Sequence, residues 1–89
     1  MIESPKSNSE LFTLYLASAV TTESAEDFGT AATLAAWVSD LLTPQEQVRA
    51  VEDAIRLVRQ IPAETRGRAL EDLQIVLDGR KEAAARQGR

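Results

Sequence analysis

The stretch Leu42-Thr43-Pro44-Gln45-Glu46 decides the fold of this chain, because it contains the chemistry with which a helix begins. The side chain of Thr43 can accept a hydrogen bond from the backbone N–H of Glu46, whose carboxylate can accept one from the N–H of Thr43. Pro44 suits the first helical position, where an N–H would have no partner. The stretch therefore predicts a helix and divides the chain into two halves.

The helix after this cap is expected to run from Pro44 to about Gln60. Its apolar residues share one half of the helical wheel and its charged and amide residues share the other, which is typical of an amphipathic helix. The apolar half consists of Val48, Val51, Ala54, Ile55, Leu57, Val58 and Ile61. Pro62 ends this helix, because proline disfavours helical geometry in the residue before it.

Toward the N-terminus, Ser7 and Glu10 repeat the spacing of a capping box and predict a helix over residues 11–20. This segment is apolar on nearly all sides, which favours a buried helix. Phe, Thr, Tyr and Val would also suit a strand, but no partner strand is evident elsewhere in the sequence. Helix is therefore the prediction.

The helix predicted from about Ser24 to Leu42 carries two apolar stripes. The first, which is rich in alanine, consists of Phe28, Ala31, Ala32, Ala35, Val38 and Leu42. The second consists of Leu34, Trp37 and Leu41 and points well away from the first. A helix with two such stripes either lies at the centre of its fold or offers one stripe to a partner.

The last predicted helix opens at Pro62 or Ala63, and Gly79 is expected to end it. Its core stripe is Leu70, Leu73, Val76 and Leu77, with Ile75 on the opposite side. The chain is thus predicted to be all-α, a small bundle of four helices with short connections, which favours antiparallel neighbours. Residues 1–6 are expected to be a flexible leader, residues 7–79 a single helical domain, and residues 80–89 a charged tail or a ragged helix extension.

Composition argues against an enzyme, since the chain has neither His nor Cys. Those residues supply the commonest general base and the commonest transition-metal ligands. The carboxylate pairs Glu26-Asp27, Glu52-Asp53 and Glu71-Asp72 are adjacent in sequence, and adjacent residues of a helix do not face each other. We therefore expect no catalytic site, no metal and no cofactor.

The N-terminus shows no basic segment followed by an apolar run, so no secretory signal is predicted. The longest weakly polar stretch, Ala31 to Leu42, is shorter than the ~20 residues that span a bilayer. A cytoplasmic protein without membrane contact is the expectation. The abundance of Arg and Ala over Lys is typical of a GC-rich bacterial genome and favours a bacterial or phage origin.

Charge is unevenly distributed along the chain, whose net charge is −4. Residues 1–43 carry one base and six acids, whereas residues 44–89 carry nine bases and eight acids. Arg66 and Arg68 precede the core stripe of the last predicted helix, and residues 60–65 could form the turn of a helix-turn-helix. A nucleic-acid-binding module using the third and fourth helices is therefore the alternative function, although acids are interleaved with these bases.

The favoured function depends on a surplus of apolar residues, Leu34, Trp37, Leu41 and Ile75, which four short helices are not expected to cover. Exposed apolar patches usually mark interfaces, and Trp is enriched among binding hot spots. Trp37 could instead be the central core residue, and the sequence leaves that question open. We predict a protein–protein interaction module of regulatory, adaptor or inhibitor type that binds a protein partner and forms a homo-oligomer, most simply a dimer.

Overall fold

A computed structural model describes residues 7–87 of the chain, and the leader predicted for residues 1–6 lies outside them. The described residues form only helices and no strands, which confirms the all-α prediction. The helices are α1 (Asn8–Thr21), α2 (Ala25–Ser39), α3 (Pro44–Arg59), the short α4 (Ala63–Arg66) and α5 (Ala69–Gln87).

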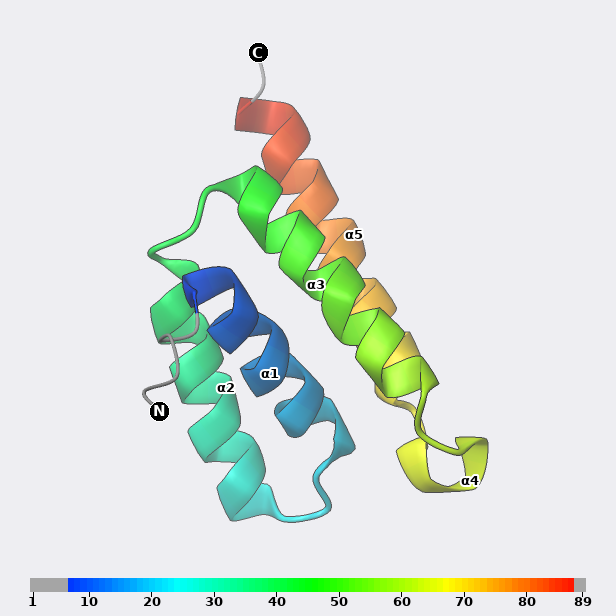
Figure 1. The fold of residues 1–89 in the computed structure, drawn as a ribbon. Coiled ribbons are helices and arrows are strands. Elements are labelled where there is room, and N and C mark those ends of the chain that lie inside the picture. Colours follow the sequence, from blue (N-terminus) through cyan, green and yellow to red (C-terminus); the bar gives the residue numbers. More distant parts are fainter. Residues whose placement is uncertain (1–6, 88–89) are drawn as a thin grey trace, which may run out of the picture.

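The four long helices are arranged as two antiparallel hairpins (Figure 1). In one hairpin α1 packs on α2, and in the other α3 packs on α5. The hairpins join through α1, which also packs on α3 and, less extensively, on α5. The short α4 lies at the turn of the second hairpin (Figure 1).

The helix starts predicted at Ser7, Ser24 and Thr43 are confirmed. The N–H of Glu46 donates to Thr43 Oγ1 at 3.1 Å and the N–H of Thr43 donates to Glu46 Oε1 at 2.9 Å, so the capping box is complete. Ser7 and Ser24 cap α1 and α2 through their hydroxyl oxygens, each accepting from the N–H three residues later. These local hydrogen bonds satisfy N–H groups that have no partner within the helix.

The predicted end of the second helix is wrong by one turn. α2 ends at Ser39, and the chain then tightens through hydrogen bonds from Leu41 N–H to Val38 O and from Leu42 N–H to Ser39 O. These bonds reach back three residues instead of four, as is common in the last turn of a helix.

The single helix predicted from residue 62 to Gly79 is also corrected. Gly67 adopts a φ of 56° and separates α4 from α5. Only glycine enters this left-handed region without strain. Gly79 does not end α5, which continues to Gln87, so residues 80–87 are a helix extension and residues 88–89 lie outside the described part.

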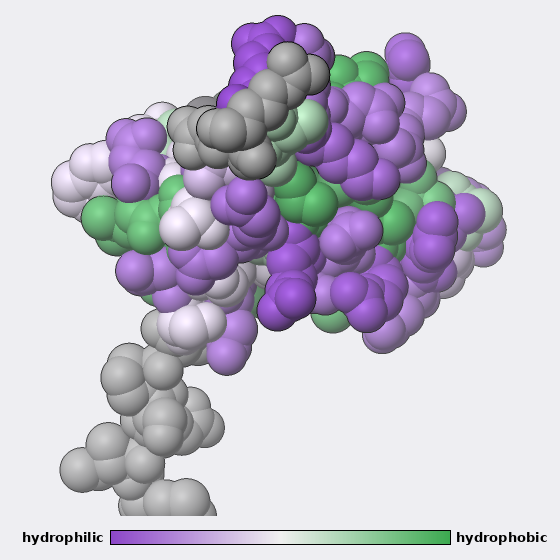
Figure 2. Space-filling model, turned by 90° about the horizontal axis from the view of Figure 1, so that it is seen from above, coloured by the Kyte–Doolittle hydropathy of each residue, from purple (hydrophilic) through white to green (hydrophobic). Residues whose placement is uncertain are grey.

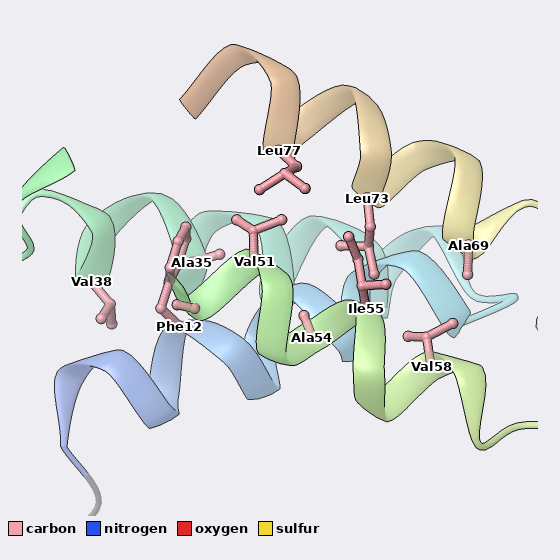
Figure 3. Close-up of a cluster of buried hydrophobic side chains, with 11 residues drawn as sticks. Phe12, Ala35, Val38, Val51, Ala54, Ile55, Val58, Ala69, Leu73 and Leu77 are labelled. Atoms are coloured by element: carbon pink, nitrogen blue, oxygen red, sulfur yellow. The ribbon is translucent and has the colours of Figure 1, made fainter. Parts of the chain in front are cut away.

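The core runs along the contact between α3 and α5 and into the α1–α2 hairpin. Figure 3 shows three side chains of α5 facing α3 in antiparallel register: Leu77 near Val51, Leu73 near Ile55, and Ala69 near Val58. Phe12 of α1, with Ala35 and Val38 of α2, continues the same cluster. Every core side chain is therefore aliphatic except Phe12.

One buried polar side chain, Thr13, joins the two hairpins. Its hydroxyl lies 3.0 Å from Ala50 O on α3 and 3.0 Å from Ser9 O on its own helix, and donates to these carbonyls. The bond to Ala50 O crosses from α1 to α3, and it therefore helps to set how closely the two helices approach.

The contribution of the capping box to the stability of α3 can be tested directly. We expect Thr43→Ala to lower the free energy of unfolding by about 1 kcal/mol, because it removes the acceptor for the Glu46 N–H. For a domain of this size, that corresponds to a fall in Tm of roughly 4–8 °C. Thermal unfolding followed by circular dichroism measures it. Thr33→Ala, at an exposed position inside α2, is the matched control and should not lower Tm.

Candidate interaction surfaces

Trp37 is at the surface, which answers the question that the sequence left open. Its side chain is 75% exposed, and Leu41 is 67% exposed. Leu34 is half-buried. We call these three residues, from α2 and the turn that follows it, the Trp37 surface.

The Trp37 surface is hollowed beside its indole ring. Trp37, Val38 and Leu41 line a shallow depression of about 350 Å³. Val38 belongs to the core, so the depression reaches from the exposed ring to the body of the bundle. On the face seen in Figure 2, hydrophobic side chains also reach the surface between hydrophilic ones.

Ile75, the fourth predicted interface residue, belongs to a different part of the molecule. It is 70% exposed on α5, and no residue of α5 lines the depression beside Trp37. α2 packs mainly on α1, whereas α5 packs mainly on α3. The structure therefore does not unite the predicted interface residues in one surface.

A second apolar feature, which the sequence did not reveal, is a groove between α2 and α5. α1 forms its floor with residues that include Leu16 and Val20, and its volume is about 560 Å³. Phe28 of α2 and Val76 of α5 line its walls. Val76 was expected in the core and Phe28 in the alanine-rich stripe of α2. Phe28 is 52% exposed and Val76 only half-buried, because α2 and α5 do not close on each other.

One end of the groove is polar and is built around Arg80. Arg80 Nη1 donates to Gln47 Oε1 at 3.2 Å, and Gln47 Nε2 donates to Ser39 O at 2.8 Å and to Leu42 O at 3.3 Å. These bonds tie α5, α3 and the end of α2 together. Arg80 Nε is buried and has no hydrogen-bond partner among the described residues.

Arg66 and Arg68, the predicted anion contacts, are both engaged within the chain. Arg66 Nη1 lies 3.4 Å from Arg59 O and 3.4 Å from Ile61 O, carbonyls at the C-terminal end of α3. Arg68 Nε forms an exposed salt bridge of 3.2 Å with Glu71 Oε2. The two side chains therefore serve different local partners.

The connection between α3 and α5 also differs from a helix-turn-helix. In that motif the two helices cross at roughly 90–120°. Here α3 and α5 run side by side in opposite directions with α4 at their turn (Figure 1). The geometry is that of a helical hairpin.

Two further observations concern residues 7–87. No cluster of three or more acidic side chains that could hold a metal ion occurs there. Nor is any helix in this part of the chain long and apolar enough to cross a bilayer. Comparisons with models of protein families, with curated proteins and with solved structures gave no match for this chain.

Proposed function

We propose that this chain is a cytoplasmic protein–protein interaction module of regulatory, adaptor or inhibitor type, which docks through the Trp37 surface and also associates with itself. The observation that carries the proposal is the exposure of Trp37 beside Leu41 on a chain whose core is complete without them. An exposed Trp and Leu next to a depression provide the anchor and the pocket typical of a docking site.

The energetic reasoning supports a partner at this surface. A tryptophan side chain can bury about 150–250 Å². Covering the exposed part of one therefore gives roughly 3–4 kcal/mol before the costs of association are subtracted. Trp37 is the most exposed of the four aromatic side chains, since Phe28 is 52% exposed, Tyr15 is half-buried and Phe12 is in the core. A partner whose apolar side chain fits beside Val38 would gain this free energy when it binds and covers Trp37.

The nucleic-acid alternative has weaker support. Arg66 donates to backbone carbonyls and Arg68 is paired with Glu71, so both side chains already have partners within the chain and the charge of Arg68 is partly neutralised. The bases of α5 are interleaved with acids. If the alternative were correct, binding to DNA or RNA would weaken steeply as salt is added and would depend on Arg66 and Arg68.

Trp37→Glu tests the proposal. We expect at least a tenfold loss of affinity for a partner captured from the host, because a charge replaces the central apolar anchor. The free energy of unfolding should change by no more than about 0.5 kcal/mol, since the position is exposed. Quantitative capture on the immobilised full-length chain, with bound protein identified by mass spectrometry, measures the loss.

Ala25→Glu is the matched control, because Ala25 is an exposed position at the start of α2, about 18 Å along the helix from Trp37. Trp37 is also the only tryptophan of the chain, so its fluorescence should shift to shorter wavelength when the partner covers it. Equal capture by the wild-type chain and by a folded Trp37→Glu variant would contradict the proposal. So would an emission maximum that the partner leaves unchanged.

A further inference from the structure

We propose that the groove between α2 and α5 is the face through which two copies of this chain associate, with their α5 helices antiparallel about a two-fold axis near Val76. This inference rests on the self-association included in the proposed function. It assigns self-association to the groove and leaves the Trp37 surface free for a different partner.

The first observation is that the groove is an apolar slot that this chain leaves unfilled. α1 is its floor, and α2 and α5 are its walls. Phe28 on one wall is 52% exposed and Val76 on the other is half-buried. A helix from outside would therefore find apolar walls on both sides and would complete the packing that α2 and α5 do not make with each other.

The charges along the wall provide the argument for a second copy. Asp72, Val76 and Arg80 are spaced by four residues, line the groove together, and thus lie on one face of α5. An antiparallel two-fold axis at Val76 places Asp72 of each copy opposite Arg80 of the other, which gives two identical ion pairs. Such self-complementarity is what a closed symmetric dimer requires.

Within one chain these two charges cannot pair. Eight residues of helix separate them by about 12 Å. Among the ion pairs formed by residues 7–87, none includes the Asp72 carboxylate. A second copy therefore supplies what the isolated chain does not.

The second observation is that the Arg80 guanidinium is held in place at one end of the groove. The guanidinium is held by its bond to Gln47, yet its Nε–H has no acceptor in the described part of the chain. A second copy does not reach Nε itself, but Arg80 lines the groove, and the Asp72 carboxylate of that copy can accept from the other N–H groups of the guanidinium. Hydrogen bonds between ionised groups are the strong ones.

Gly79 and Ile75 fit the same arrangement. Glycine weakens a helix, and a Cβ added at Gly79 would meet nothing within 4 Å in the described chain, so this chain's own packing does not require glycine there. Ile75 lies three residues from Asp72 and four from Gly79, and therefore beside both on the helix surface. A second α5 could approach closely at Gly79 and cover Ile75.

The test measures self-association of the full-length chain by sedimentation equilibrium at low salt. Asp72→Arg alone and Arg80→Asp alone should each weaken the dimer at least tenfold, because each brings like charges face to face. The double variant Asp72→Arg/Arg80→Asp should restore association to within about threefold of wild type, since the pairs form again with reversed polarity. Circular dichroism confirms folding, which matters because Arg80 also holds Gln47.

Ile75→Glu is a second variant that avoids this complication, because its position is exposed in the single chain, and it should also weaken the dimer. A chain that stays monomeric up to about 1 mM, near the weak limit of specific binding, would overturn the inference. Unchanged association of Asp72→Arg, or a folded double variant without recovery, would overturn it as well.

The failure of this inference is distinguishable from failure of the proposed docking function. Trp37→Glu should leave the dimer intact while it abolishes capture of the partner. If Trp37→Glu dissociates the dimer and Asp72→Arg does not, the groove is not the self-association face, and the Trp37 surface retains its proposed role. If Trp37→Glu and Asp72→Arg both self-associate as the wild-type chain does, the groove inference is overturned. If Trp37→Glu nevertheless loses capture of the partner, docking through the Trp37 surface is supported.

Discussion

Leu73→Ala is expected to lower the free energy of unfolding by about 2–5 kcal/mol, the largest effect of any single truncation considered for this chain. Leu73 is fully buried (0% exposed) and is the largest of the completely buried side chains. It packs from α5 against Ile55 of α3, in the core of the second hairpin (Figure 3). Because small domains are stable by only about 5–15 kcal/mol, the variant should lose a large fraction of its stability.

Denaturation by urea, followed by circular dichroism at several chain concentrations, measures this loss apart from any contribution of dimerisation. Ile75→Ala is the matched control, since it lies two residues away on the same helix with its side chain mostly in water. It should change the stability of the monomer by no more than about 0.5 kcal/mol. Equal losses in the two variants would contradict the orientation of α5.

The features that could be predicted from the sequence are those fixed by residues close in the chain. The capping residues Ser7, Ser24 and Thr43 each bond to an N–H three residues later, so their effect depends on neighbours that the sequence already shows. The amphipathic pattern of α3 is equally local, and its predicted core residues Val51, Ile55 and Val58 are buried.

The two glycines near the last helix show where this reasoning fails. Gly67 has a positive φ and separates two helices, whereas Gly79 lies inside a continuous helix. Local propensity alone does not distinguish them. The difference is tertiary, because Arg80, the residue after Gly79, is bonded to Gln47 of α3 and holds the helix in register beyond the glycine.

The candidate site could be predicted only in part for a similar reason. The helical wheel showed that Trp37 and Leu41 point away from the core stripe of α2, and they are exposed. It could not show whether another helix covers the Phe28 side of α2, because that depends on where α5 lies. The groove exists because α5 packs on α3 and leaves α2 uncovered on that side, and only the assembled fold contains this information.

Ala50→Leu is expected to lower the free energy of unfolding by about 2–4 kcal/mol, because the contact between the hairpins has no room for a larger side chain. Ala50 is buried, and its carbonyl oxygen lies 3.0 Å from Thr13 Oγ1 on α1. The added carbons would force α1 away from α3. That movement would cost packing and would also break the bond from Thr13.

The same denaturation experiment measures the effect, and Ala85→Leu, at an exposed position of α5, is the control that adds the same atoms without crowding.

The role of Thr13 can be separated by a double-mutant cycle. If Ala50→Leu already breaks the bond to Thr13, then Thr13→Val should cost less in that background than in the wild-type chain, and the two losses should not add. Simple additivity, or an Ala50→Leu variant as stable as wild type, would show that α1 and α3 can separate there at little cost. The close approach through Ala50 would then not be what holds the two hairpins together.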